Sequence, residues 1–300
     1  MSVPAAYIAI VLIWATTPLA VKWSAVEAGF LFAVLSRMFI AAVFCQLLTH
    51  LLRSDWHWHK RALSMYLLSG FNISFSMLLI YWGAQTISSG LVALLFGLMP
   101  LLTGVFAALI LKEKSLTLEK LLGISIAFSG LVIIFYSDQT QQQGYLMAII
   151  AVLTAVSWHS FSTVVFKRYA SDLPIMSVTT ASIWVSVFFL SIAWWLSGNQ
   201  IPLDISETGW GSILYLSIIA SVIGFTIYFY VLKNTQASTI ALIPLITPVL
   251  ALLLGQYLNN EQVDKNVWTG ALFILSGLSL YQVSNVLKRL ARKIITVVNE

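Results

Sequence analysis

Ten apolar runs, each about as long as a membrane-spanning helix, restrict what this 300-residue chain can fold into. A helix needs about 20 residues to cross the roughly 30 Å hydrocarbon core of a bilayer. The runs are too long and continuous for barrel strands, and a helix satisfies its own backbone hydrogen bonds in lipid. We therefore predict an all-α integral membrane protein with spans at residues 3–22, 30–52, 62–84, 87–111, 117–136, 144–166, 174–197, 209–232, 237–258 and 266–287.

Composition also indicates that lipid is the solvent. Hydrophobic residues make up 59% of the chain and charged residues only 9%, against about a quarter charged in soluble domains. A soluble fold could not hide that much apolar surface. The net charge of +5 does not indicate binding of nucleic acid, because the basic residues sit at the ends of apolar runs. Cys45, the one cysteine, lies inside a run, where we expect a small buried hydrophobe.

The basic residues are distributed asymmetrically about the ten spans. Only Lys22 and Lys265 fall on the side opposite the N-terminus, and Arg37 lies within a span. Because basic residues favour cytoplasmic loops, both termini are expected in the cytoplasm. The basic residues on the N-terminal side are Arg53, Lys60, Arg61, Lys112, Lys114, Lys120, Lys167, Arg168, Lys233, Lys288, Arg289, Arg292 and Lys293.

The two ends of the chain each require an interpretation. Residues 286–295 alternate basic and apolar residues at helical spacing. They are predicted to continue the last helix and then lie along the anionic inner leaflet, or to form a solvated basic end. The first span lacks the basic n-region and the cleavage site of a signal peptide, so we expect it to remain as helix one.

The second half of the chain repeats the first. Pro100 and Pro248 are 148 positions apart, as are Glu113 and Glu261. Each half holds five spans, and an odd number forces the second half to enter the membrane from the opposite side. Inverted repeats of this kind are typical of alternating-access transporters. The predicted units are residues 1–137, 138–287 and a basic cytoplasmic tail, 288–300.

Motifs for enzymatic chemistry are missing from the sequence: no HExxH, CxxC, P-loop or GxSxG stands on a suitable element. We therefore expect no enzymatic activity, no catalytic residue, no cofactor and no metal. His57 and His59 could form a metal pair. Their loop also holds Trp56 and Trp58, however, which is typical of a loop at the membrane interface, and we favour that interpretation.

Ionisable side chains inside a membrane are costly, so each one needs a reason. Arg37 could be an ionic anchor for a substrate carboxylate, could snorkel, or could hold backbone carbonyls, and we favour the structural roles. His159 could relay a proton, bind substrate, or bond a neighbouring helix as a neutral ring. No Asp or Glu lies centrally in a span, which argues against a carboxylate proton relay. Glu113 and Glu261 precede helix starts, and we interpret both as structural.

Uncharged polar and aromatic residues recur on several spans and predict a modest, nearly neutral central cavity. His159 and Ser162, for example, are three apart and share one helix face. The same residue types also join helices to one another, so that role stays open for each of them. The residues predicted to bind substrate are Trp14, Thr17, Asn72, Ser76, Trp158, His159, Ser162, Phe225 and Tyr228.

Prolines within the spans remove a backbone hydrogen bond and can act as hinges. Two of them fall in the ninth span, which makes that helix the best candidate for a bending gate. The four predicted hinge residues are Pro18, Pro100, Pro244 and Pro248.

In these residues the chain resembles the drug/metabolite transporter superfamily, and within it the EamA-type ten-helix family. The resemblance covers almost the whole chain. It rests on the segment WATTPLAVK at 14–22, on Arg37, and on the repeated series Pro100…Glu113 with Pro248…Glu261 and Gly123…Gly130 with Gly270…Gly277.

The resemblance implies a central cavity lined by the first, third, fourth, sixth, eighth and ninth helices and open to one side at a time. Related proteins commonly export amino acids or other small metabolites across the bacterial inner membrane. Ala15 stands where the family often has glycine, and His159 stands where a small or hydroxyl residue is usual, so the substrate is not carried over.

We therefore expect a secondary transporter that works as a monomer or homodimer. Its partners would be a small-molecule substrate and membrane lipid. The alternatives are a membrane-embedded enzyme acting on lipid and a non-transporting membrane scaffold.

Overall fold

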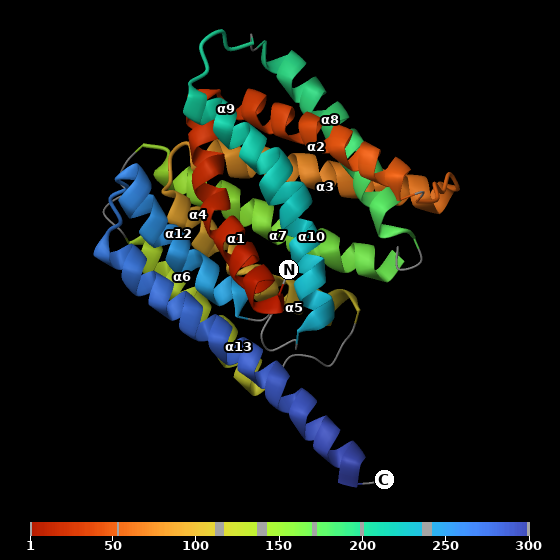
Figure 1. Ribbon diagram of the computed structural model, residues 1–300. Coiled ribbons are helices and arrows are strands. Elements are labelled where there is room, and N and C mark those ends of the chain that lie inside the picture. The colour runs from red at the N-terminus through yellow and green to blue at the C-terminus, as the bar shows by residue number, and fades with distance from the viewer. Residues whose placement is uncertain are drawn as a thin grey trace.

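The computed structural model describes residues 2–52, 54–111, 117–136, 143–169, 173–198, 201–235 and 242–298, and helices are the only regular structure in these ranges (Figure 1). In chain order they are α1 (Val3–Glu27), α2 (Phe30–Leu51), α3 (Lys60–Ala84), α4 (Ser89–Phe96), α5 (Met99–Ile110), α6 (Leu118–Phe135), α7 (Tyr145–Tyr169), α8 (Ile175–Ser197), α9 (Glu207–Leu214), η2 (Tyr215–Ile223), α10 (Gly224–Asn234), α12 (Ile243–Asn259) and α13 (Lys265–Val298).

These helices make ten membrane crossings. Eight helical spans are long and apolar enough to cross a bilayer, and two of them are composite: α4 with α5, and α9 with η2 and the start of α10. α12, which has 17 residues, and α13 supply the other two. The predicted all-α membrane fold with ten spanning helices is therefore confirmed. We call the end of the bundle where α1 begins the N-side, and the end where α1 finishes the far side.

Helices of the two halves pack on one another reciprocally. α3, the third helix of the first half, lies against α7, the first helix of the second half. Conversely α9 and α10, which belong to the third span of the second half, lie against α1. α5 packs on α7 as α12 packs on α1. This is the arrangement of two inverted five-helix repeats.

Two pairs of glycines bring α6 and α13 into backbone contact. A Cβ built on Gly130 would lie 2.5 Å from the carbonyl oxygen of Gly270, and one built on Gly270 would lie 2.6 Å from that of Gly130. Gly123 faces Gly277 in the same way, two turns along. The two helices therefore run antiparallel, and their small residues allow the close approach that stabilises helix pairs in lipid.

The fourth span differs from its prediction as one continuous helix over 87–111. α4 ends at Phe96 and α5 begins at Met99, so the span is interrupted at Gly97 and Leu98. Pro100 occupies the first turn of α5, where its missing N–H costs no helical hydrogen bond. The other predicted hinges divide into two kinds: Pro244 lies in the first turn of α12, and Pro18 and Pro248 lie inside α1 and α12.

Two further features of the helices correct the sequence prediction. α1 continues to Glu27, so Lys22 lies within the helix instead of at its last position. The eighth span contains the π-helical segment η2, whose wider turns the apolar pattern does not reveal. α12 of the ninth span is described from Ile243 onward, and the predicted first residues of that span, 237–241, lie outside the described ranges.

The C-terminal helix continues well beyond the predicted span. α13 runs unbroken to Val298, and Figure 1 shows it extending past the rest of the bundle. Its backbone therefore agrees with the predicted continuation of the last helix. Its position relative to the lipid surface stays a prediction.

The largest buried apolar cluster joins the two halves. It includes Tyr81 of α3, Leu94 of α4, Ile149 of α7 and Ile274 of α13. Helices from both repeats thus share one core, which holds α3 and α7 side by side and positions the residues described next.

Candidate functional site

A polar cluster lies where α3 of the first half meets α7 of the second. The Asn72 side chain lies within hydrogen-bond reach of the His159 ring, with 3.4 Å between Nδ2 and Nδ1. The Ser76 hydroxyl, one turn along α3, donates to Asn72 Oδ1 at 3.5 Å and to the Ala155 carbonyl at 3.4 Å. Three residues predicted separately from the sequence therefore come together across the boundary between the halves.

Aromatic rings form a wall beside this cluster. The Trp158 ring centroid lies 5.7 Å from Phe75 and 6.2 Å from Phe71, both on α3, with the rings edge to face. Phe161, on the next turn of α7, tilts against Trp158 at 5.7 Å. Such packing fixes the orientation of the indole.

Two polar atoms on α7 are buried without a hydrogen-bond partner among the described residues: Trp158 Nε1 and Ser162 Oγ. The two residues are one turn apart on the same helix face, and Ser162 is only 5% exposed. An unpaired buried donor is unfavourable by a few kcal/mol, so most such groups in proteins find a partner. This face of α7 therefore offers two hydrogen-bonding groups beside the Asn72–His159 pair.

The equivalent tryptophan of the first half packs in a matching way. Trp14 of α1 lies 4.9 Å from Tyr228 of α10, ring to ring, just as Trp158 packs on α3. The Thr17 hydroxyl donates to the Ile13 carbonyl of its own helix at 2.7 Å. The Phe225 side chain lies outside the described part of the chain. The predicted residues thus form two groups, one around Trp158 and one around Trp14.

Arg37 of α2 is buried, at 7% exposure, and contacts one residue from each half of the protein. Its Nη1 donates to the Tyr81 hydroxyl at 3.2 Å, and its Nη2 donates to the Ser221 hydroxyl at 3.4 Å. Its Nε has no partner among the described residues. Both partners are neutral hydroxyls that the sequence could not have paired with it.

A cavity of about 510 Å³ lies elsewhere, between α1, α9, η2 and the end of α12. None of the nine residues predicted to bind substrate lines it. At its wall, Thr16 and the Tyr215 hydroxyl share a 2.6 Å hydrogen bond. Leu12 and Leu258 line it and are exposed, so it opens to the outer surface of the bundle. The predicted central cavity therefore stays a prediction.

The loop between α2 and α3 shows ring packing. Trp56 and Trp58 stack at 5.9 Å, and the rings of His57 and His59 meet edge to face at 5.9 Å. Within the described ranges no group of three or more His, Cys, Asp or Glu could hold a metal ion. The position of this loop at the membrane interface stays a prediction.

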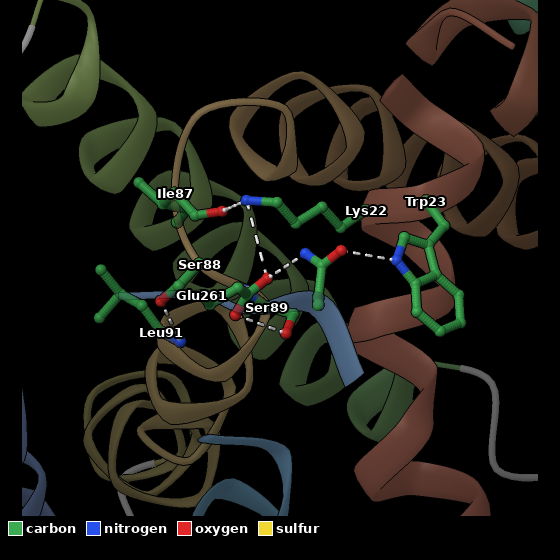
Figure 2. Close-up of polar contacts among 8 residues, drawn as sticks. Lys22, Trp23, Ile87, Ser88, Ser89, Leu91 and Glu261 are labelled. Carbon is green, nitrogen blue, oxygen red and sulfur yellow. Dashed lines mark hydrogen bonds and ion pairs between the residues drawn. The ribbon is translucent and has the colours of Figure 1, made fainter. Parts of the chain in front are cut away.

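Glu261 has a structural role, but not at the helix start that the sequence suggested. Its carboxylate accepts hydrogen bonds from Ser89 at the start of α4, and not from the start of α13, the next helix (Figure 2). Glu113, its counterpart in the first half, lies outside the described residues. The α4 partner was missed because it comes from the other half, and no local pattern reveals such a contact.

Comparison with known proteins supports one family. The model of the EamA-like transporter family matches twice, at residues 3–136 and 144–282. The uncharacterized transporter YoaV of Bacillus subtilis is 26% identical over 90% of this chain and 93% of its own length. Protein PagO of Salmonella typhimurium is 23% identical over 88% of this chain and 87% of its own, and the uncharacterized inner membrane transporter YedA of Escherichia coli K12 is 25% identical over 61% and 58%.

A solved structure shares the fold. It covers 94% of this chain, and 97% of its own length is matched, with a TM-score of 0.63 at 17% sequence identity. At that identity the likeness concerns the arrangement of the helices alone.

Proposed function

The chain belongs to the EamA-like transporter family and is a multi-pass membrane transporter, and we propose that it exports amino acids or similar small polar metabolites across the bacterial inner membrane. Transport is by alternating access: the two inverted halves rock so that a central site faces one side at a time. Both termini lie in the cytoplasm, because the basic residues of the sequence gather on the N-side.

The substrate site of this proposal is the polar cluster on α3 and α7. It is supported by one observation above all: Trp158 Nε1 and Ser162 Oγ are buried beside the Asn72–His159 pair and have no hydrogen-bond partner within the described part of the chain. A polar solute that enters here can satisfy groups that the described residues leave without a partner. Because α3 and α7 belong to opposite halves, such a solute would also contact both moving parts.

The chemistry of this cluster favours a small solute with a polar and an apolar part. Asn72, His159 and Ser162 offer amide, imidazole and hydroxyl groups, which bind both donors and acceptors. The aromatic ring of Trp158 offers an apolar surface for the apolar part of such a solute. Small binding sites commonly combine aromatic walls with a few convergent polar groups in this way.

Flux into proteoliposomes tests the proposal. The purified protein is reconstituted, and uptake of a panel of labelled amino acids and metabolites is measured against concentration. We expect saturable flux of at least one solute. The Trp158→Ala and His159→Ala substitutions should each raise KM about ten-fold, which corresponds to about 1.4 kcal/mol of lost interaction with the solute.

A matched pair of variants on α7 separates binding from general damage. Ser162→Ala removes an unpaired hydroxyl, whereas Thr154→Val removes a hydroxyl that bonds its own helix at Ile150 on an exposed face. Only the first should change KM. Flux unaltered by all three site substitutions would exclude this cluster as the binding site, and transport that is insensitive to pH would exclude His159 as a proton carrier.

A further inference from the structure

A network of polar contacts ties the far-side ends of α1, α4 and α12 together (Figure 2). The Glu261 carboxylate accepts hydrogen bonds from the Ser89 backbone N–H, with its two oxygens at 3.1 and 3.0 Å, and from the Ser89 hydroxyl at 2.9 Å. The amide of Asn259 donates to the same carboxylate at 3.0 Å. Ser89 is the first residue of α4, so a negative charge meets the positive end of that helix dipole.

Lys22 and Trp23 of α1 complete the network. Lys22 Nζ donates to the Ile87 carbonyl at 2.7 Å and lies 3.8 Å from Glu261 Oε1. The Trp23 indole donates to Asn259 Oδ1 at 2.8 Å. The Glu261 side chain is 5% exposed and that of Lys22 is 17% exposed. We call Lys22, Ser89, Asn259 and Glu261 the far-side clasp.

The local backbone directs Glu261 toward α4. Asn260 closes α12 with a left-handed conformation at φ 48°, which reverses the chain so that the Glu261 N–H reaches the Gly255 carbonyl at 3.1 Å. Glycines let the two helices meet closely: a Cβ on Gly255 would lie 2.8 Å from Ser89 Oγ, and a Cβ on Gly90 would lie 2.5 Å from the Leu252 Cα. The turn at Asn260 and the close approach of α12 to α4 therefore position the Glu261 carboxylate at the start of α4.

The clasp lies on the seam between the halves. Lys22 and Ser89 belong to the first half, and Asn259 and Glu261 belong to the second. The contacts made by Glu261 to Lys22 and Ser89 therefore break if the far-side ends of the halves part. Water can then replace the carboxylate at the α4 N–H groups and solvate both charges, so the parted state is not penalised by an unpaired buried group. Contacts that can part without leaving such a group suit a reversible gate better than a permanent joint.

We propose that the far-side clasp is the gate that closes the far side of the transport path, and that separation of Glu261 from Lys22 and Ser89 opens it. This inference rests on the alternating access proposed above. Its prediction concerns conformation, however, so it can be tested without a known substrate.

Distances between spin labels on the two halves measure the gate directly. In a Cys45→Ala background, labels are placed at Gln85→Cys on the far-side end of α3, and at Tyr257→Cys, an 83% exposed position on α12. The full-length protein in lipid nanodiscs should show mainly the short distance. Glu261→Gln and Lys22→Gln should each raise the ratio of long to short distances about five-fold or more, the low end of typical coupling effects.

Three controls accompany the measurement. Lys265→Gln removes a positive charge from an exposed far-side position outside the clasp and should leave the distances unchanged. A label pair at Gln85→Cys and Glu27→Cys, both in the first half, should not respond to Glu261→Gln. Lys22→Arg keeps the charge and should restore the closed distribution, which distinguishes gating from a folding defect.

The outcomes separate this inference from the proposed function. Distances unchanged in both Glu261→Gln and Lys22→Gln would overturn the gate, whatever the transport assays show. A shift to long distances in these variants supports the gate even if no solute in the panel is transported, a result that would count against the proposed export alone. If both label pairs lost their defined distances in these variants, the clasp would only hold the fold. That result would also overturn the gate.

Discussion

Arg37 holds its charge within the membrane through two neutral hydroxyls, one from each half of the protein. Tyr81 comes from α3 and Ser221 from η2, and Tyr81 is fully buried. A hydrogen bond to a charged group contributes more to stability than one between neutral groups. A buried charge that loses such a bond is not solvated by water instead. These contacts favour the structural interpretation of Arg37 over an ionic anchor for substrate.

Removal of one hydroxyl tests that interpretation. Tyr81→Phe leaves Arg37 with Ser221 as its hydrogen-bonding partner, so we expect the apparent Tm in detergent to fall by about 3–6 °C without any substrate present. Tyr257→Phe removes the same group from an 83% exposed ring and should leave Tm unchanged. Equal melting of the wild type and Tyr81→Phe would show that the Arg37–Tyr81 bond does not hold the fold.

Single residues were easier to predict from the sequence than their partners. The sequence marks Arg37 and His159 because an ionisable group in an apolar run needs a reason. It also marks Asn72, but the contact with His159 joins positions 87 residues apart. Nothing local in either segment encodes that pairing. That Trp158 Nε1 has no hydrogen-bond partner among the residues the structure describes depends on all its neighbours, and so needs the folded structure.

At the scale of helices, apolar length determines most of what can be predicted. Ten runs of about 20 apolar residues give ten spans, because the bilayer thickness sets the length. Helix ends and irregular turns are less visible: the interruption at Gly97 and the π-helical turns of η2 lie inside continuous apolar runs. Hydropathy indicates which segments lie in lipid, but it does not indicate how their backbone hydrogen bonds are arranged.

The pairing of α6 with α13 gives a prediction at this scale. Gly130→Ala places a methyl group 2.5 Å from the Gly270 carbonyl oxygen, so the helices must separate. Overpacking of this kind costs about 1–3 kcal/mol, and we expect the apparent Tm to fall by about 2–10 °C. Gly211→Ala is the matched control, because a Cβ there meets open space and alanine favours the helix. Equal effects of the two substitutions would contradict the close pairing.

For the whole molecule, the 148-residue offset was the most informative part of the sequence. It predicts two halves, and five spans in each half invert the second. The packing of α3 on α7 and of α9 and α10 on α1 matches that arrangement. The far-side clasp was not predictable in the same way. Lys22 and Glu261 come from opposite ends of the chain, and they meet because the inverted halves place α12 beside α1 and α4.

The orientation of the whole bundle decides what the far-side clasp faces. The basic residues gather on the N-side, so we expect the far side to face outward from the cytoplasm. In a Cys45→Ala background, Gln85→Cys should react with a membrane-impermeant maleimide on intact spheroplasts, and Asp55→Cys, in the exposed loop before α3, should react only after permeabilisation. Cys45→Ala alone should not react at all.

The reverse labelling pattern would contradict the orientation and would place the clasp at the cytoplasmic end. The gate would then control entry from the cytoplasm. A protein with the clasp closed would be open to solutes from outside. With the expected pattern, the clasped protein is sealed toward the outside. That is the state in which an exporter must bind its substrate, because a solute can enter from the cytoplasm without a leak only while the opposite end is closed.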